Sequence, residues 1–184
     1  MKKPISISAP LTTADLQPLR AGDRVLIQGT VYTARDSAHR RLVKALEQEQ
    51  DLPFDPRGQI IYYTGPAPAS PGTVIGPAGP TTSGRMDPFT LPLLKAGLKG
   101  MIGKGDRSPE TAADIQKAGA VYLVATGGAA ILLARAIRKA EIAAYPELGP
   151  EAILRLEVED FPALVALDIH GNNLYREGRK KFKK

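Results

Sequence analysis

The sequence predicts an α/β domain in which helices flank a partly parallel, mixed sheet. Short runs rich in β-branched and aliphatic residues alternate along the chain with segments whose apolar residues recur at helical spacing. The chain has 184 residues, of which 43% are hydrophobic and 24% charged, so it can bury one core but is short for two. We therefore expect a single domain over residues 1–175 and a basic C-terminal tail over residues 176–184.

The first half of the chain predicts strands separated by a helix and a long loop. The β-branched run at 24–32 predicts one or two short strands, and apolar residues at helical spacing predict a helix over 36–49. Prolines and a glycine then break the chain before a strand over 59–63. Residues 64–84 are dense in Gly and Pro, and so long a loop inside a compact domain is more often functional than filler.

The second half continues the alternation. Ser108 precedes Pro109 and Glu110, which is typical of a helix start because Ser caps, Pro fits the first turn and Glu complements the helix dipole. The Gly-Asn-Asn sequence at 171–173 predicts the turn of a hairpin. The expected elements are helices over 88–96, 108–118 and 126–139, strands over 99–103, 120–125 and 153–158, and the hairpin over 163–175.

Positive charge concentrates in the tail. Residues 176–184 hold six basic residues and one acidic residue, so they carry +5 of the net charge of +6. A short like-charged terminus is usually a solvated, frayed end. Aromatic residues make up 5% of the chain and do not alternate with basic ones, so we expect no nucleic-acid binding. A non-catalytic anion- or RNA-binding module that uses the tail is the alternative; its affinity would fall steeply with salt.

The sequence excludes several chemistries. It has no cysteine, so this chain supplies no disulfide, thiol nucleophile or thiolate ligand for a metal or cluster. It has two histidines, His39 and His170, so we expect no self-contained metal site. No apolar run approaches the roughly 20 residues that span a bilayer, and the N-terminus has no apolar segment typical of a signal peptide. We expect no membrane association and a cytoplasmic location.

Three predicted junctions between a strand and a helix are candidate anion sites, because free backbone N–H groups point outward there. They lie at 33–36, 80–87 and 124–128, and the carboxyl ends of parallel strands bring such junctions to one crevice. The glycines at 97–104 do not have the spacing of a phosphate-binding P-loop. Nucleotide binding therefore has no motif support.

Three cations stand beside flexible backbone: Arg35 and Arg85 within these junctions, and Lys104 between two glycines. Guanidinium groups bind carboxylates through two parallel hydrogen bonds, so two of them at opposite ends of a pocket would select a dicarboxylate. Each also has a plainer interpretation. Arg35 and Asp36 could form a surface ion pair, and Lys104 could lie in a solvated turn.

Five stretches, in this order, resemble a known family: GTVYTARDSAHRRL (29–42), YYTGPAPA (62–69), IGPAGPTTSGRMD (75–87), IGKGDRS (102–108) and VATGGAAILLA (124–134). They resemble the β subunit, or C-terminal region, of class I iron–sulfur hydro-lyases, which include oxygen-sensitive fumarate hydratases and L(+)-tartrate dehydratases. The resemblance covers about residues 20–175. It implies the swivelling β/β/α fold.

The resemblance also implies a cofactor and a partner. In two-subunit members of the family, a larger α subunit holds a [4Fe–4S] cluster through three cysteines, and the assembly is an α2β2 heterotetramer. A chain without cysteine fits the β half, which would be inactive alone. The implied reaction is the reversible hydration of fumarate, a C4 dicarboxylate, to (S)-malate. L(+)-tartrate dehydratase, which produces oxaloacetate and water, is the alternative, and none of the quoted residues separates the two.

The family's site residues carry over onto matching positions. The resemblance implies that Thr81 is the catalytic base and that Arg35, Arg85 and Lys104 bind the substrate. A threonine hydroxyl is a poor base unless it is activated, and in the family an acidic residue of the α half assists it. Five further positions are candidates for a supporting shell: Asp36, His39, Thr82, Asp87 and Gly127.

Two of these supporting roles stay open at this stage. His39, one turn into a predicted helix, could orient Arg35 or Asp36. Asp87 could cap the helix that follows it or support Arg85, and we favour capping. Close helix packing explains the glycines at 127 and 128 as well as a place near the pocket does.

Overall fold

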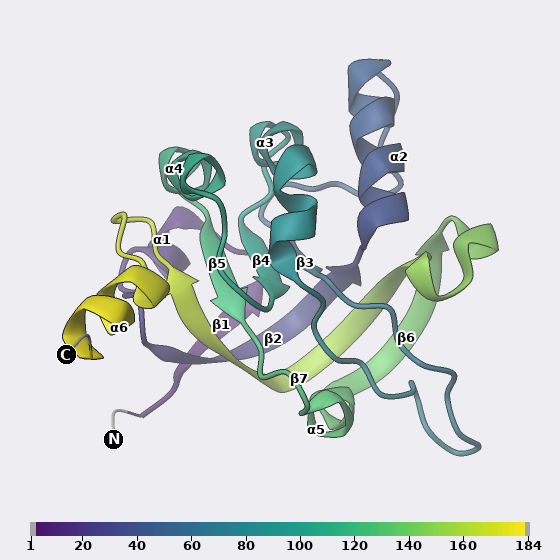
Figure 1. Ribbon diagram of the computed structural model, residues 1–184. Helices are drawn as coiled ribbons and strands as arrows, with labels where there is room; N and C mark the ends of the chain where they lie inside the picture. The colour runs from purple at the N-terminus through teal and green to yellow at the C-terminus, as the bar shows by residue number, and fades with distance from the viewer. Residues whose placement is uncertain (1–2, 183–184) are drawn as a thin grey trace.

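The computed structural model describes residues 3–182 and is built on one mixed sheet (Figure 1). Its seven strands follow the order β1-β2-β3-β4-β5-β7-β6, and β2 also pairs with β7. Strands β1 to β5 pair in parallel, whereas β7 runs antiparallel to β2, β5 and β6. The strands are β1 (Ile5–Ala9), β2 (Arg24–Thr33), β3 (Ile60–Tyr62), β4 (Gly100–Gly103), β5 (Val121–Val124), β6 (Ile137–Ala144) and β7 (Ile153–Leu167).

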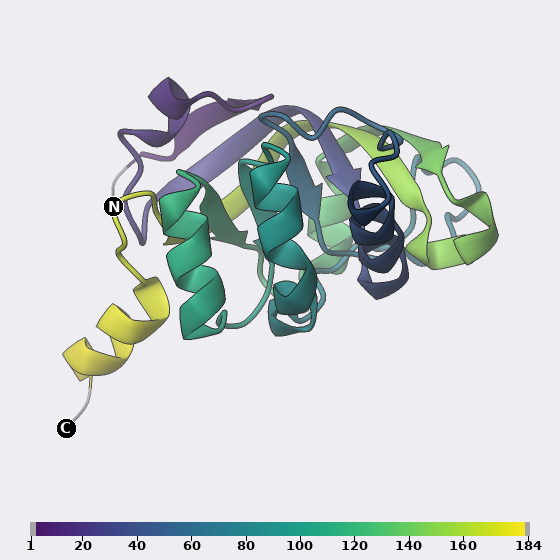
Figure 2. The same cartoon turned by 90° about the horizontal axis from the view of Figure 1, so that it is seen from above.

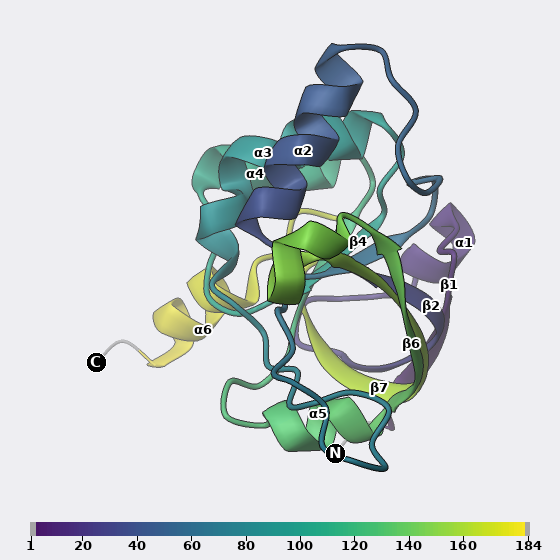
Figure 3. The ribbon, with the colours of Figure 1, turned by 90° about the vertical axis from the view of Figure 1, so that its right-hand side faces the viewer.

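Helices cover one face of the parallel strands, and the antiparallel ribbon of β6 and β7 curves beneath the other face (Figures 1 and 3). Helices α2, α3 and α4 lie side by side in the covering layer, as the view from above shows (Figure 2). These helices span Asp36–Glu47, Asp87–Lys95 and Pro109–Lys117; the smaller helical elements are α1 (Thr13–Leu16), η1 (Ser83–Met86), α5 (Ala130–Arg135), η2 (Pro146–Glu151) and α6 (Leu174–Phe182).

The alternation of side chains along the parallel strands produces two cores. In β3, Ile60 and Tyr62 face the antiparallel ribbon and pack with residues such as Phe161. Ile61 and the following Tyr63 face the helices and pack with residues such as Leu93. Because successive residues of a strand point to opposite faces, one short apolar strand contributes to both cores.

The predicted α/β class with a mixed sheet is confirmed. One predicted element is wrong: the helix expected over 126–139 ends at Arg135, and residues 137–144 form β6. The expected hairpin is reduced to its turn: β7 runs unbroken from Ile153 to Leu167, the chain turns over residues 168–172, and one antiparallel bridge joins Leu167 to Asn173 before α6. The side chain of Asn173 accepts hydrogen bonds from the amides of Tyr175 and Arg176 at 2.9 and 3.2 Å, which is the pattern of a helix N-cap.

Helix α6 contains residues 176–182 of the expected tail. It begins at Leu174 and runs to Phe182, so the boundary proposed at residue 175 falls inside a helix. Residues 183 and 184 of the tail lie outside the described residues. Within residues 3–182, no helix combines the length and the apolar character needed to cross a bilayer.

The topology places the candidate site. Strands β2, β3, β4 and β5 are parallel neighbours, so their carboxyl ends share one edge of the sheet. The segments that leave this edge begin at Ala34, Tyr63, Lys104 and Ala125. Each predicted strand-to-helix junction therefore lies along this edge.

Candidate active site at the carboxyl ends of the parallel strands

Thr81 lies against the end of β4, although no strand contains it. Its N–H donates to the carbonyl oxygen of Tyr63 at 2.7 Å, and the N–H of Lys104 donates to the Thr81 carbonyl oxygen at 3.1 Å. The N–H of Ser83 donates to the Lys104 carbonyl oxygen at 2.9 Å, and Thr82 and Lys104 form a parallel bridge. Residues 81–83 thus extend the sheet by a short parallel stretch, which holds the half-buried Thr81 next to Lys104.

A glycine permits this close approach. A Cβ atom at Gly103 would collide with the Ser83 hydroxyl oxygen and would lie 2.9 Å from the ring of Tyr63. No larger residue fits at the end of β4 while residues 81–83 lie beside it.

Lys104 presents an unpaired cation. Its side chain is exposed, and its ammonium has no ion-pair or hydrogen-bond partner in the part of the chain that the structure describes. Gly127 lies beside its aliphatic stem, because a Cβ there would be 3.7 Å from Lys104 Cδ. Residues 124–128, the third predicted junction, therefore approach residues 80–87, the second, at Lys104.

Arg85 is held by Asp36 through one hydrogen bond and one ion-pair contact. Arg85 Nε donates to Asp36 Oδ1 at 3.0 Å, and Nη2 lies 2.8 Å from Oδ2. The Asp36 side chain is 19% exposed and that of Arg85 is 50% exposed. Asp36 thus pairs with Arg85 rather than with its neighbour Arg35, and it ties η1 to the first turn of α2.

Arg35 lies beside a second carboxylate, Glu151. Arg35 Nη2 is 3.5 Å from Glu151 Oε1, and Glu151 Oε2 accepts from the N–H of Ser37 at 2.9 Å. Burial raises the pKa of Glu151, but the hydrogen bonds from Ser37 and the charges of Arg35 and Arg85 lower it more, so its pKa lies below the ordinary value. Arg35 Nε is buried and has no acceptor among residues 3–182.

Helix α2 supports Arg35 from behind through His39. His39 is buried, and its Nδ1 lies 2.9 Å from the carbonyl oxygen of Arg35. Because a carbonyl can only accept, Nδ1 carries the hydrogen. Burial lowers the pKa of His39 to about 4, so the ring is neutral near pH 7. Of the two partners considered from the sequence, His39 contacts Arg35.

Asp87 does not have the capping role that we favoured. It is the first residue of α3, whose N-cap position, Met86, makes no side-chain capping bond. Asp87 instead accepts from Arg107 Nε at 2.6 Å and from the N–H of Ser108 at 2.9 Å. A fully buried guanidinium requires a counterion more strongly than an exposed helix end requires a cap.

Sequence reasoning missed two residues of this region, Glu151 and Arg107. Glu151 comes from the connection between β6 and β7, which no local pattern links to Arg35. Arg107 lies in the stretch at 102–108 that resembles the family and directly before the helix-capping Ser108, but neither position indicated its role. The predicted residues themselves form two neighbouring groups along the edge, Thr81 with Lys104 and Gly127, and Arg85 with Asp36 and Arg35.

The edge suits a small dianion but offers no metal site. Three cationic side chains and a half-buried hydroxyl lie along this edge, and one guanidinium keeps a buried donor without a partner among the described residues. Among the described residues, no group of three or more His, Asp or Glu side chains could hold a metal ion, and the chain has no cysteine. These residues therefore do not fit an iron–sulfur cluster.

Comparison with known proteins identifies a family and its relatives. Residues 1–178 match the family described as the fumarase C-terminus. A protein of Methanocaldococcus jannaschii, provisionally named L(+)-tartrate dehydratase subunit beta, is 40% identical over 177 residues, which cover 93% of this chain and 91% of that protein.

Longer relatives also match. A protein of Geobacillus stearothermophilus, provisionally named class I fumarate hydratase, is 38% identical over 184 residues, covering 97% of this chain and 35% of that protein. The anaerobic class I fumarate hydratase of Escherichia coli is 40% identical over 167 residues, covering 89% of this chain and 30% of the enzyme. The chain spans about a third of the length of these fumarate hydratases.

Proposed function

Because the chain belongs to the fumarase C-terminal family, we propose that it is the β subunit of a heteromeric [4Fe–4S] hydro-lyase that interconverts fumarate and (S)-malate. One observation carries this proposal. The cations Arg35, Arg85 and Lys104 line the same edge as the Thr81 hydroxyl, and the buried Arg35 Nε has no protein acceptor among the described residues. The Arg35 side chain is 25% exposed, so a substrate carboxylate can approach it from solvent.

The arginines can bind a carboxylate without giving up their acidic partners. Asp36 faces Nε and Nη2 of Arg85, and Nη1 has no partner among the described residues. Glu151 faces one terminal nitrogen of Arg35 and leaves Nε unpaired. Asp36 and Glu151 thus hold the two guanidinium groups in place, while the unpaired ammonium of Lys104 adds a third positive charge for the dianion.

We assign Thr81 to the proton-transfer step of the reaction. Hydration of fumarate places a hydroxyl on one carbon of the double bond and a proton on its neighbour. We assign the Thr81 hydroxyl to the neighbouring carbon, where malate loses a proton in the reverse direction. A threonine hydroxyl needs an activating group for this work, and we assign that group to the partner subunit.

The partner in this proposal is a cluster-bearing α subunit in an α2β2 assembly in the cytoplasm. The fumarate hydratase relatives carry about two thirds of their length outside the region that this chain matches, which is room for the cluster half. Exposed apolar side chains beside the edge support a covering partner: Val74 is 51% exposed, and Ile131 and Leu132, which follow Gly127 in sequence, are 63% and 62% exposed.

L(+)-tartrate dehydratase is the second candidate. One observation favours it: the Methanocaldococcus jannaschii relative that bears this name in provisional form matches from end to end, whereas the fumarate hydratases match over a third of their length. Both substrates present two carboxylates on a four-carbon frame, so the same three cations serve either.

The test is an anaerobic assay of the reconstituted complex. The chain is co-expressed with the α subunit from the same source, the cluster is reconstituted, and turnover is measured on fumarate and on L(+)-tartrate. Our proposal predicts a kcat/KM at least about tenfold higher for fumarate, a difference of about 1.4 kcal/mol in transition-state binding. The opposite ranking would assign the tartrate activity, and an intact complex inactive on both would overturn the proposal.

A further inference from the structure

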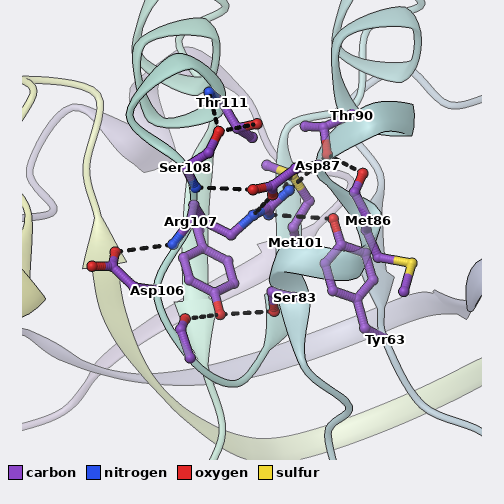
Figure 4. A network of polar contacts seen from close by, with 12 residues as sticks. Tyr63, Ser83, Met86, Asp87, Thr90, Met101, Asp106, Arg107, Ser108 and Thr111 are labelled. Carbon is purple, nitrogen blue, oxygen red and sulfur yellow. Dashed lines mark hydrogen bonds and ion pairs between the residues drawn. The ribbon is translucent and has the colours of Figure 1, made fainter.

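Arg107 is a fully buried cation that the proposed reaction does not use. Its side chain is 0% exposed, and each nitrogen of its guanidinium has a partner (Figure 4). Nε donates to Asp87 Oδ1 at 2.6 Å, and Nη2 donates to Thr90 Oγ1 at 2.6 Å. Nη1 lies 3.5 Å from the Tyr63 hydroxyl, and the guanidinium carbon lies 5.6 Å from the centre of the Tyr63 ring. Burying a charge costs free energy unless it is paired, so a buried and fully paired guanidinium indicates a specific structural role.

The partners of Arg107 are the groups that hold residues 81–87 in place. Thr90 Oγ1, which accepts from Arg107, donates to the carbonyl oxygen of Met86 at 2.9 Å. Asp87 ends the segment and also accepts from the N–H of Ser108. Tyr63 accepts the Thr81 N–H on its carbonyl oxygen at 2.7 Å.

A second aromatic ring extends the network to the middle of the segment. The Arg107 guanidinium lies 5.1 Å from the centre of the Tyr122 ring. The Tyr122 hydroxyl lies 2.8 Å from Ser83 Oγ and 2.7 Å from the Gly105 carbonyl oxygen, so it joins the segment to the turn after Lys104. Arg107 thus contacts residues that fix the segment at its start, its middle and its end.

We propose that Arg107 is a positioning residue, which sets the placement of Thr81 and Arg85 relative to Lys104 through Asp87, Thr90 and the two tyrosines. This inference rests on the proposed function. Backbone hydrogen bonds join residues 81–83 to Tyr63 and Lys104, but residues 80–82 belong to no helix or named strand, so side-chain contacts share in fixing their placement. A displacement of about 1 Å in a catalytic group can cost on the order of 100-fold in rate.

The planar guanidinium is required for this role. Asp87, Thr90 and Tyr63 surround it on three sides, and the rings of Tyr63 and Tyr122 pack near its faces. A lysine ammonium in the same place reaches one or two of these acceptors and leaves the others unpaired. Arg107→Lys therefore keeps the charge and removes the connection.

The first experiment follows amide hydrogen exchange of the full-length chain without a partner. It compares the wild type with Arg107→Lys and with the milder Thr90→Val, which removes the acceptor of Nη2. Leu156→Ala, a fully buried position in the other core, is the control for lost stability. We expect exchange at the amides of Thr81, Ser83 and Lys104 to rise at least about tenfold relative to β7 in the first two variants and not in the control.

The second experiment measures kcat and KM of the assembled complex well below its melting temperature. We expect kcat to fall about 10- to 100-fold in Arg107→Lys and about 3- to 10-fold in Thr90→Val, while Leu156→Ala keeps the wild-type kcat. If Arg107→Lys does not fold, Thr90→Val decides. Unchanged exchange at residues 81–83 together with unchanged kcat in a folded variant would overturn the positioning role.

Different results would contradict the proposed function and the positioning role of Arg107. An inactive wild-type complex would contradict the proposed function. The exchange experiment needs neither substrate nor partner, so it tests the role of Arg107 in holding the segment whichever reaction the complex performs.

Discussion

Two arginine–carboxylate pairs define the chemistry of the edge. Arg85 and Asp36 share a hydrogen bond and an ion-pair contact, whereas Arg35 and Glu151 share one contact at 3.5 Å. The first pair ties Arg85 to helix α2, and the second leaves the buried Nε of Arg35 without a partner among the described residues. The sequence indicated the arginines but not their acidic partners, because it suggested Asp36 as a neighbour of Arg35 and contained no signal for Glu151.

Replacement of Arg85 tests this arrangement at the scale of one residue. We expect Arg85→Lys to raise KM about 10- to 100-fold with a smaller change in kcat, because lysine cannot bind Asp36 and a substrate carboxylate in one plane. Steady-state kinetics of the complex measure this. Arg138→Lys is the matched control, since Arg138 pairs with Glu159 at 2.8 Å, is 60% exposed and belongs to β6, which contributes no residue to the candidate site. Equal KM values for the two variants would remove Arg85 from the site.

At the scale of elements, local patterns predicted the strands and helices that carry the site. The segments now described as β2, α2, β3, α3, β4, α4 and β5 were each expected at nearly the observed bounds. β6 was not, because residues 137–144 contain alanine, isoleucine, lysine and glutamate, which also favour a helix. Pairing with β7 from Ile137 to Ala144 overrides that preference, and no local pattern reveals such pairing.

Helix α2 also gives a prediction about pH. The pKa of His39 is lowered to about 4 in the folded chain from 6.5 in the unfolded chain. Between these values the unfolded state binds the proton, so the stability that a neutral His39 contributes is complete above pH 6.5 and is lost as the pH falls toward 4. The loss from this group reaches about 3 kcal/mol.

Urea unfolding of the wild type and of His39→Gln at pH 7.5, 6 and 5 measures this contribution. Glutamine keeps a donor for the Arg35 carbonyl but does not titrate. The free energy of unfolding of the wild type should fall relative to that of the variant as the pH is lowered. A difference between the two proteins that stays constant from pH 7.5 to 5 would contradict the account of His39.

At the scale of the whole molecule, the fold brings together site residues that lie far apart in the sequence. Residues 35, 81, 104 and 127 come from four different strand ends, and the parallel order of β2 to β5 brings them to one edge. The motifs in these segments could be found in the sequence because each is local. The roles of Arg107 and Glu151 could not, since they depend on contacts with residues distant in sequence, such as Thr90 and Arg35.

The edge as it stands is half of a site in our account. It offers a hydroxyl and three cations for a dicarboxylate, and none of the described residues forms a metal-binding group. The central claim is that Thr81 acts in a hydro-lyase completed by the cluster-bearing partner. Thr73, which lies on the exposed loop before Thr81 and donates to the Ser70 carbonyl oxygen at 2.7 Å, provides a matched control.

The most direct measurement is the anaerobic kcat for fumarate hydration by the complex that contains wild-type, Thr81→Ala or Thr73→Ala chain. We predict a loss of at least about 100-fold in Thr81→Ala, within the range of general acid–base catalysis, with wild-type turnover in Thr73→Ala and none from the chain alone. Wild-type turnover in a Thr81→Ala complex, or turnover by the isolated chain, would contradict the account.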